Sequence, residues 1–412
     1  MLLPQIFRRE ALEITPWVLP LWLCTVYPFS AEQKALSLHL VNMTSLTDIQ
    51  PKSSWISGDR PYLIAGPCSA ETPEQIRATV QGLLPAKPDA IRAGIWKPRT
   101  RPNTFEGIGP EALLWIKEAT EGTGIPVMVE VASAKHVELS LAAGIDMVWI
   151  GARTTVNPFM VQEIAEALRG SNIPVLVKNP VNPELDLWIG ALERLHKVGI
   201  TKLAAIHRGF SGYEKTIYRN HPNWELPIEL RRQLPDLMMI CDPSHISGNA
   251  LLVADTAQIA LDLDFDGLMI ETHHDPARAW SDAAQQITPD QLCRLMKELV
   301  FRREHIEDPA FNAQLELLRT RIDGIDEALL KLLADRLDII RDIGAVKMEN
   351  DITILQPTRW AEIFETRLVE ASERSLDQAF VSRLLHLLHE ESINTQVKVF
   401  REQRDNTPKK QA

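Results

Sequence analysis

A regular alternation of short apolar runs and amphipathic segments, which begins at residue 62, most restricts the fold of this chain. Continuous apolar runs that are bounded by turn residues and separated by helical patterns are typical of parallel βαβ units. Eight such units in about 240 residues match a (β/α)8 barrel, an α/β fold that we predict over residues 43–305. The runs are YLIAGPCS (62–69), AIRAGIWK (90–97), VMVEVAS (127–133), MVWIGAR (147–153), PVLVKNP (174–180), LAAIHRGF (203–210), LMMICDPSH (237–245) and GLMIETHH (267–274).

Each apolar run ends in a polar or ionisable residue. In such a barrel the carboxyl ends of all strands lie on one face, where the loops that follow them build the active site. One charged residue at a strand end is usually just solvated, but eight that converge indicate a site. These residues are Cys68, Lys97, Glu130, Arg153, Lys178, Arg208, Asp242 with His245, and Glu271.

The basic residues of this face contrast with the chain as a whole, which has 44 Lys+Arg against 55 Asp+Glu and a formal net charge of −11. An acidic balance argues against non-specific binding to nucleic acids or anionic membranes. A local cationic pocket instead predicts small anionic substrates with phosphate and carboxylate groups. Its expected members are Arg92, Lys97, Arg99, Arg153, Lys178 and Arg208.

Four further residues are candidate metal ligands: Cys68, His245, Glu271 and Asp282. A thiolate, an imidazole and two carboxylates suit a divalent ion, and Mn, Fe, Co and Zn all stay possible. Their positions after the first, seventh and eighth strands bring them together, because barrel closure makes the eighth strand a neighbour of the first. Taken alone, a buried cysteine is usually structural and His245 could be an ordinary loop residue.

Several short segments at the ends of the apolar runs are informative because of their order along the chain. They are GPCSAE (66–71), KPRT (97–100), GAR (151–153), VKNP (177–180), HRG (207–209), DPSH (242–245) and ETH followed by SDAAQQ. Over about residues 50–305 they resemble 3-deoxy-D-arabino-heptulosonate 7-phosphate (DAHP) synthase of the shorter, type Iβ-like form. The resemblance implies a metal-dependent condensation of phosphoenolpyruvate with erythrose 4-phosphate, which yields DAHP and phosphate. It assigns the metal to Cys68, His245, Glu271 and Asp282, phosphoenolpyruvate to Arg92, Lys97, Arg153, Lys178 and Arg208, and the erythrose phosphate group to Arg99 and Thr100.

Lys97 is also a candidate catalytic proton donor, if crowding by Arg92 and Arg99 lowers its pKa. The alternative on the same fold is 3-deoxy-octulosonate 8-phosphate synthase, which uses arabinose 5-phosphate. To our reading of the two families, that enzyme lacks a KPRT segment at this position. A non-enzymatic alternative is a degraded regulator with intact pockets but no turnover, and the complete set of metal and phosphate residues argues against it.

After about residue 305 strand signals disappear and apolar residues follow helical spacing. The pattern persists from about 310 to 350, which is longer than a usual globular helix and indicates an intertwined or coiled-coil-like bundle. Pro357 suits the first turn of a second helix, and a third is predicted from about 377 to 402. We therefore predict a smaller all-α domain of three helices over 306–403. The apolar positions are Leu315, Leu318, Ile322, Ile325, Leu329, Leu332, Ile340 and Ile343.

The segments LRTRIDGIDEALLKLLADRLDIIRDIGAVK and EESINTQ resemble the first and third helices of the all-helical chorismate mutases. The resemblance implies rearrangement of chorismate to prephenate without a cofactor or nucleophile, with Lys347 and Gln396 facing the ether oxygen. Arg319 precedes Arg336 by 17 residues, about 25 Å of helix, so it cannot serve the same pocket in one straight helix, and a partner chain lying antiparallel could supply it. The implied pocket is Arg319 from the other subunit, Arg336, Lys347, Arg359, Ser392 and Gln396. Gln356 and Trp360 depart from the family, some members of which carry acidic residues there.

Two interpretations of the helical domain stay open. It is either a working isomerase that forms a homodimer or larger assembly, or a mutase-like sensor and dimerisation module, and we favour the active enzyme. Both can hold, because a fused pocket for an end-of-pathway compound is a natural feedback device. We therefore expect prephenate to inhibit the synthase.

The two ends of the chain read differently from its domains. Residues 1–42 lack a clean period, and we interpret them as a poorly ordered extension with Met43 as the natural start; we interpret 404–412 as a disordered tail. The longest apolar run, 17–29, is too short for a membrane span and contains two prolines. A signal peptide after Arg8 and Arg9 is the less favoured alternative. Four cysteines without a CxxC motif fit a reducing compartment, so we expect a cytoplasmic enzyme.

Overall fold

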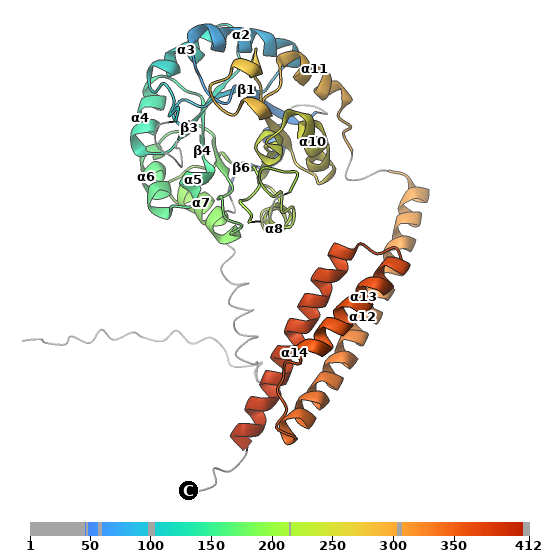
Figure 1. The fold of residues 1–412 in the computed structure, drawn as a ribbon. Helices are drawn as coiled ribbons and strands as arrows, with labels where there is room; N and C mark the ends of the chain where they lie inside the picture. Colours follow the sequence, from blue (N-terminus) through green and yellow to red (C-terminus); the bar gives the residue numbers. More distant parts are fainter. Residues whose placement is uncertain are drawn as a thin grey trace, which may run out of the picture. The chain divides into compact units, whose positions relative to one another are not determined.

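The computed structural model describes residues 46, 48–56, 60–97, 104–213, 216–302 and 307–406. The chain divides into two compact units between residues 302 and 303 (Figure 1). The predicted extension 1–42, most of the predicted tail, and Arg99 with Thr100 lie outside the described residues. Within the described ranges, no helix is long and apolar enough to cross a bilayer.

The first unit contains a closed barrel of eight parallel strands in sequential order, which confirms the predicted (β/α)8 fold. Strands β1 and β8 pair from Tyr62–Gly267 to Gly66–Glu271, and this pairing closes the barrel. The carboxyl ends of β1 and β8 are therefore neighbours. The strands are β1 (Tyr62–Gly66), β2 (Ala90–Ala93), β3 (Val127–Val131), β4 (Met147–Ile150), β5 (Val175–Lys178), β6 (Leu203–His207), β7 (Met238–Cys241) and β8 (Gly267–Glu271).

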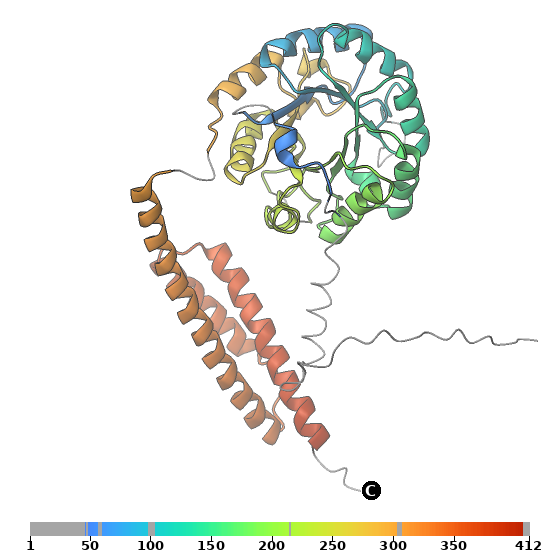
Figure 2. The same cartoon turned by 180° about the vertical axis from the view of Figure 1, so that it is seen from behind.

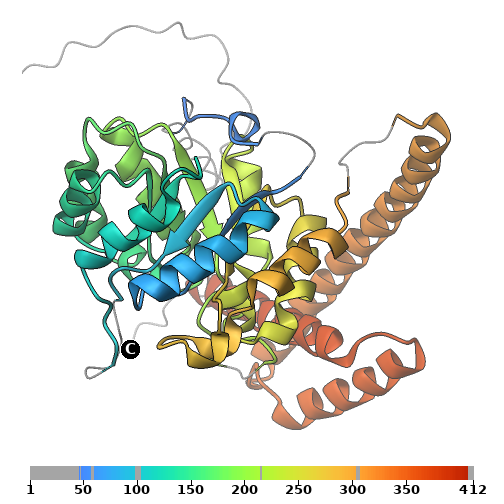
Figure 3. The ribbon, with the colours of Figure 1, turned by 90° about the horizontal axis from the view of Figure 1, so that it is seen from above.

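Helices surround the strands on the outside of the barrel (Figures 1 and 2), and Figure 3 shows the same arrangement from the side. Several begin at the caps that their sequences favour, since Thr72, Ser133 and Asn157 each accept a hydrogen bond from a first-turn amide. The helices are α2 (Pro73–Leu83), α3 (Glu111–Thr120), α4 (Ala134–Ala142), α5 (Ala152–Thr155), α6 (Pro158–Leu168), α7 (Leu185–Lys197), α8 (Glu225–Gln233), α9 (Pro243–Ser247), α10 (Val253–Asp262) and α11 (Pro289–Glu298). Short 3-10 turns are η1 (Lys52–Ser54), η2 (Leu84–Ala86), η3 (Ala250–Leu252), η4 (Pro276–Arg278) and η5 (Ala283–Gln285).

The barrel has two apolar cores, because successive residues of a strand point to opposite faces. One core lies between the strands and the outer helices. The other fills the inside of the barrel and includes Ile64, Met128, Trp149 and Met269. Above Trp149 the interior becomes polar, since the guanidinium of the fully buried Arg92 lies 4.8 Å from the indole centroid. The inner core thus supports the base of a charged site.

The second unit consists of α12 (Pro309–Glu349), α13 (Pro357–Glu373) and α14 (Gln378–Asn406), which confirms the predicted three-helix domain. Asp308 caps α12 and Pro309 occupies its first turn, as Pro357 does in α13. Helix α14 packs along both α12 and α13 (Figure 1). It continues to Asn406, so residues 404–406 of the predicted disordered tail are helical.

An apolar face of α12 is exposed in the single chain. Ile322, Ile325, Leu329 and Leu332 are each more than half exposed. Their spacing of three and four residues puts them on one stripe, and three helices in one chain leave it uncovered. An exposed apolar stripe of this kind typically marks a protein–protein contact.

Candidate active sites

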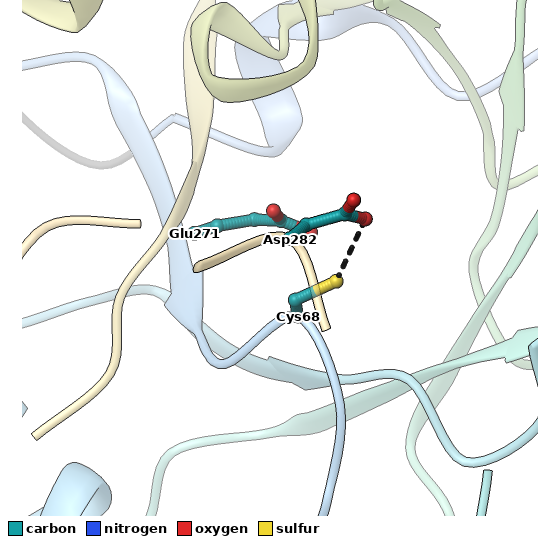
Figure 4. A group of neighbouring side chains, drawn as sticks. All are labelled: Cys68, Glu271 and Asp282. Carbon is teal, nitrogen blue, oxygen red and sulfur yellow. Dashed lines mark hydrogen bonds between the residues drawn. The ribbon is translucent and has the colours of Figure 1, made fainter. Parts of the chain in front are cut away.

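Three of the four predicted metal ligands meet at the mouth of the barrel (Figure 4). Cys68 follows β1, Glu271 ends β8, and Asp282 lies just before η5. Their ligand atoms are all within 4.8 Å of one another, and Cys68 Sγ lies 3.4 Å from Asp282 Oδ2. The pairing of β1 with β8 brings these residues together.

His245, the fourth predicted ligand, adjoins this group without joining its tightest cluster. It lies in α9, after β7, and its Nε2 is 3.8 Å from Glu271 Oε1. Its other ring nitrogen, Nδ1, is 2.8 Å from Asp242 Oδ2. A carboxylate on one nitrogen fixes the ring orientation, and this leaves Nε2 directed toward the cluster.

The chemistry of these donors fits a divalent cation. Burial and the neighbouring Glu271 raise the pKa of the Cys68 thiol to about 12, so a nearby positive charge is needed to favour its thiolate. Glu271 is fully buried, and its Oε1 lies 3.2 Å from Arg92 Nη2 but accepts no hydrogen bond from the described residues. A buried thiol, two carboxylates and an oriented imidazole are ligands that transition metals accept.

The pKa of Lys97 differs from the sequence expectation. Burial and the nearby Arg92 lower it, whereas Cys68, Glu271 and Glu130 raise it, and on balance the pKa is raised. The lowering that was a condition of the proton-donor role is not found among the described groups, and Arg99, one of the two cations it invoked, lies outside them. The barrel brings the Glu271 carboxylate, at the end of β8, into its surroundings.

Cationic side chains line a pocket that adjoins the cluster. Glu130, His245 and Asp282 of the cluster line the same pocket. Lys178 and Arg208 are buried, and burial lowers the pKa of both, that of Arg208 to about 10. Lys178 Nζ donates a hydrogen bond to Asp242 Oδ2 at 2.7 Å. The pocket contains Lys97, Arg153, Lys178 and Arg208, and it has the charge that an anionic substrate requires.

Sequence reasoning did not assign roles to three residues that the structure places at this mouth. Asp242 contacts both Lys178 and His245, and the DPSH segment is the sequence feature from which its role could have been predicted. Glu130 lines the pocket, and its position at a strand end was noted without a role. Arg219 lies 3.0 Å from Asp282 and belongs to a long segment that carries no recognisable motif.

In the helical unit, three predicted pocket residues meet between α12 and α14. Arg336 Nη1 donates a hydrogen bond to Ser392 Oγ at 2.9 Å, and Gln396 Nε2 donates one to the Ser392 carbonyl at 3.2 Å. Ser392 and Gln396 are buried, and Gln396 Oε1 has no hydrogen-bond partner among the described residues. Burial lowers the pKa of Arg336. Partly buried Arg336 and buried Ser392 and Gln396 thus form a polar patch between α12 and α14.

Gly344 allows α14 to approach α12 at this patch. A Cβ at Gly344 would lie 3.3 Å from Gln396 Cγ and 3.4 Å from Val399 Cβ. The first distance is tighter than most Cβ contacts and the second is at the limit of ordinary van der Waals contact, so a side chain larger than that of alanine would push against α14. Sequence analysis did not identify this glycine, because its role depends on which residue of α14 faces it.

The other predicted mutase residues lie elsewhere in the single chain. Lys347 Nζ donates a hydrogen bond to the Ile354 carbonyl at 2.6 Å, and burial lowers its pKa. Arg319 and Arg359 are exposed and pair with Glu316 and Glu362 respectively.

The structure also describes Gln356 and Trp360, the two positions that depart from the mutase pattern. Trp360 stacks on His389, with ring centroids 3.8 Å apart, and Gln356 is the N-cap residue of α13. The Trp360 side chain thus joins α13 to α14 by aromatic packing.

A (β/α)8 barrel with a thiol, carboxylates, an imidazole and several cations at its mouth defines an enzyme for small anionic substrates. The helical unit adds a second polar site. The chain belongs to the DAHP synthetase I family, whose model matches residues 47–307. The model of chorismate mutase type II matches residues 318–397.

Similar proteins support both assignments. Phospho-2-dehydro-3-deoxyheptonate aldolase of Thermotoga maritima is 29% identical over 246 residues, which cover 60% of this chain and 70% of that protein. Its crystal structure gives a TM-score of 0.54 at 28% identity, and the match covers 59% of this chain and 69% of that one. The T-protein of Enterobacter agglomerans is 33% identical over 84 residues, 20% of this chain and 22% of that protein.

The barrel also resembles an enzyme of the alternative class. The 2-dehydro-3-deoxyphosphooctonate aldolase of Geotalea daltonii is 26% identical over 265 residues, which cover 59% of this chain and 93% of that protein. The family model for the barrel is nevertheless that of the DAHP synthetases. The predicted fusion is therefore confirmed: a DAHP synthase, which is a transferase, is followed by a chorismate mutase, which is an isomerase, and both are enzymes of aromatic amino-acid biosynthesis.

Proposed function

We propose that the barrel condenses phosphoenolpyruvate with erythrose 4-phosphate in a metal-dependent reaction, and that the helical unit converts chorismate to prephenate. The main support is the cluster of Cys68, Glu271 and Asp282 beside a pocket of cations. A pocket with this charge suits substrates that carry two phosphates and a carboxylate. The domain limits 43–305 and 306–403 belong to this proposal.

Cys68, His245, Glu271 and Asp282 would hold the divalent ion, for which Mn, Fe, Co and Zn are all candidates. When bound, such an ion supplies Lewis acidity toward the aldehyde oxygen. Within the protein, Asp242 holds the His245 ring, and Arg92 compensates the buried charge of Glu271. The residues around the ligands thus fix their geometry before any substrate enters.

The pocket cations Lys97, Arg153, Lys178 and Arg208 would bind and orient phosphoenolpyruvate. The family assignment adds Arg92, which is fully buried beside Glu271 and does not line the pocket in this structure. The charges of the pocket cations offset the repulsion between the two anionic substrates, so that the reacting carbons can approach. Lys97 holds a proton at Nζ next to the cluster and is our candidate acid. Arg99 and Thr100, which lie outside the described residues, are assigned to the erythrose phosphate group from the KPRT segment alone.

One assay separates the synthase from its alternative. Phosphate release by the full-length protein is measured with phosphoenolpyruvate and either erythrose 4-phosphate or arabinose 5-phosphate. We expect turnover with erythrose 4-phosphate, loss of turnover with a chelator, and recovery when Mn²⁺ or Co²⁺ is added. Preference for arabinose 5-phosphate would identify the octulosonate enzyme, and turnover insensitive to chelation would contradict metal dependence.

For the mutase we propose a pocket made by two copies of the chain. Arg336, Lys347, Arg359, Ser392 and Gln396 would come from one copy and Arg319 from the other. The exposed stripe on α12 supports a dimer in which the two copies of this helix lie antiparallel. Cations bind the two carboxylates and favour the compact conformer of chorismate, while Lys347 and Gln396 stabilise the ether oxygen as its bond breaks.

Loss of chorismate absorbance on addition of the protein tests the mutase directly. The alternative function, a sensor and dimerisation module, predicts binding of chorismate or prephenate without turnover. We favour turnover because Lys347 and Gln396, which would face the ether oxygen, are both present in the chain. The Gln396 atom that can donate to that oxygen is Nε2, which donates to the Ser392 carbonyl in the single chain. Catalysis that survives Gln396→Ala would contradict its assigned role.

We also propose that prephenate bound to the helical unit inhibits the synthase. The test measures phosphate release against prephenate concentration in the wild-type protein and in the Arg336→Ala variant. Inhibition in the wild type that weakens in the variant supports feedback through this pocket, and equal responses contradict it. A cytoplasmic location is proposed as well, in keeping with the free thiols of Cys68, Cys241 and Cys293.

A further inference from the structure

The segment between β6 and α8 had no role in the sequence analysis, yet one of its residues reaches the metal-ligand cluster. Arg219 Nη1 lies 3.0 Å from Asp282 Oδ1 and donates a second hydrogen bond to Gln285 Oε1 at 2.7 Å. One guanidinium nitrogen therefore joins the loop after β6 to two residues of the loop after β8.

The contact continues from Gln285 to a second candidate ligand. Gln285 is buried, and its Nε2 donates a hydrogen bond to Glu271 Oε2 at 2.7 Å. Arg219 thus touches Asp282 directly and Glu271 through a single amide. Both carboxylates of the cluster are connected to the same cation.

The contacts divide the oxygens of each carboxylate into two groups. Asp282 uses Oδ1 for Arg219, while Oδ2 faces Cys68 Sγ at 3.4 Å. Glu271 uses Oε2 for Gln285, while Oε1 faces His245 Nε2 at 3.8 Å. In both residues one oxygen is occupied by the network and the other faces a candidate metal ligand, and Glu271 Oε1 also lies 3.2 Å from Arg92 Nη2.

The backbone at Asp282 makes such support necessary. Asp282 has φ 47° and ψ 38°, which is the left-handed region that side chains other than glycine adopt at a cost. The hydroxyls of Ser69 and Ser281 lie 2.6 Å apart and anchor the residue before it. No regular helix or strand determines where the Asp282 carboxylate points, so its side-chain partners do.

The position of Arg219 is itself fixed by the helix that carries His245. The Arg219 amide donates a hydrogen bond to the Ser247 carbonyl at 3.3 Å. A Cβ at Gly248 would come within 2.4 Å of Arg219 Cβ, so the glycine that ends α9 leaves room for this arginine. Arg219 is therefore in contact with the loops after β6, β7 and β8.

We propose that Arg219 is a positioning residue of the metal centre, which orients Asp282 directly and Glu271 through Gln285. This inference rests on the proposed metal-dependent function. Removal of a hydrogen-bond partner of a ligand carboxylate typically lowers metal affinity by roughly 10–100-fold. Repulsion between a guanidinium and a bound cation acts in the opposite direction. Because the Arg219 side chain is 48% exposed, solvent screens that repulsion, and orientation is the larger effect.

The test titrates Co²⁺ into full-length protein that has been freed of metal by a chelator. Binding is followed by calorimetry and by the near-ultraviolet charge-transfer absorption of a cobalt–thiolate bond, a signature that a merely structural residue would not move. We expect Arg219→Ala to weaken Co²⁺ binding by about 10–100-fold and to alter this absorption. Arg219→Lys keeps a charge but not the planar fork, and we expect only partial recovery.

Arg278→Ala is the matched control, since this arginine lies in the same loop as Asp282 but its side chain is 87% exposed and pairs with Asp275. We expect it to bind Co²⁺ like the wild type. Gln285→Ala tests the connection to Glu271, and we expect it to weaken Co²⁺ binding. In the double variant with Arg219→Ala and Gln285→Ala, the loss of binding free energy should be smaller than the sum of the losses in the two single variants. If Arg219→Ala does not fold, the proposal is tested by comparing Co²⁺ binding of Arg219→Lys and Gln285→Ala with that of the wild type.

Unchanged or tighter Co²⁺ binding by Arg219→Ala, with a normal cobalt–thiolate absorption, would overturn the positioning role and leave the metal site intact. Absence of that absorption in the wild-type protein would instead contradict the proposed metal site, and the role of Arg219 with it. The two failures are therefore distinguishable in one set of titrations.

Discussion

Lys97 Nζ lies 3.0 Å from Cys68 Sγ, so the lysine that follows β2 contacts the thiol that follows β1. The same lysine lines the anion pocket. The candidate metal cluster and the candidate substrate pocket thus meet at Lys97, and Asp282 of the cluster also lines the pocket. Substitutions in the metal cluster should therefore alter substrate binding, and substitutions in the substrate pocket should alter metal binding.

The first prediction concerns Cys68. We expect Cys68→Ser to lower metal affinity by more than the roughly 10–100-fold that loss of an outer partner costs, because it removes a ligand itself. Metal content after dialysis and phosphate release both measure this. Chorismate turnover should not change, since Cys68 belongs to the other compact unit.

Cys293→Ser is the control for this experiment, because Cys293 is a free thiol of α11 outside the cluster. It should keep wild-type metal content. Retention of metal and synthase activity by Cys68→Ser would contradict the proposed ligand set.

The second prediction concerns Asp242, which is fully buried between Lys178 and His245. In Asp242→Asn the charge of Lys178 loses its buried partner, and breaking a buried pair costs about 3–5 kcal/mol. We expect a lower free energy of barrel unfolding by denaturant. Asp255→Asn is the control, because Asp255 of α10 is exposed. A decrease in the free energy of unfolding as large as that in Asp242→Asn would refute the pairing argument.

The sequence predicted the barrel because each strand is encoded locally. The run YLIAGPCS contains β1, and GLMIETHH contains β8, so apolar content and turn residues were sufficient. Barrel topology then determined that Cys68 and Glu271 would be neighbours, without any knowledge of distances. This is why the four candidate metal ligands could be grouped from the sequence, and the structure brings three of them within 4.8 Å of one another.

The remaining features depend on contacts that no local pattern records. The pKa of Lys97 is raised because Cys68 and Glu271 lie near it, and its sequence neighbours are cations. The pairing of Arg219 with Asp282 joins two irregular loops 63 residues apart. The space for α14 at Gly344 depends on helix register. Each requires the three-dimensional arrangement before its energy can be assessed.

The third prediction is a pH dependence of stability. His207 is fully buried among Trp188, Phe210 and Trp224, and burial lowers its pKa from 6.5 to about 3. Below pH 6.5 the unfolded chain binds a proton that the folded chain does not, so the free energy of unfolding decreases as pH falls toward 3. The slope from this one residue is about 1.4 kcal/mol per pH unit.

His207→Phe removes this titration and places another aromatic ring in an aromatic environment. We expect its stability to fall less steeply than that of the wild type between pH 6.5 and pH 4, as measured by denaturant titrations at each pH. The other titrating groups are common to both proteins, so the difference isolates His207. Parallel stability curves would contradict the assigned pKa.

The fourth prediction concerns Gly344. In Gly344→Val the added side chain presses on Gln396 and Val399 of α14, and we expect lower mutase activity because Gln396 is displaced. Phosphate release should be unchanged. Gly324→Ala is the matched control, since a Cβ there meets nothing within 4 Å and removes a helix-destabilising glycine. An undiminished mutase rate in Gly344→Val would show that the contact does not matter for catalysis.

The last prediction tests whether the mutase pocket is shared between two chains. Arg319 pairs only locally in one chain, whereas Arg336 reaches Ser392, so we expect Arg319→Ala and Arg336→Ala each to lose most mutase activity. When the two variants are unfolded together and refolded at equal concentrations, half of the dimers contain one chain of each kind. In such a dimer one pocket keeps both arginines and the other loses both, so about a quarter of wild-type activity should return. No recovery, although mixed dimers are detected by mass spectrometry, would place Arg319 outside the pocket, and full activity of Arg319→Ala alone would have the same meaning.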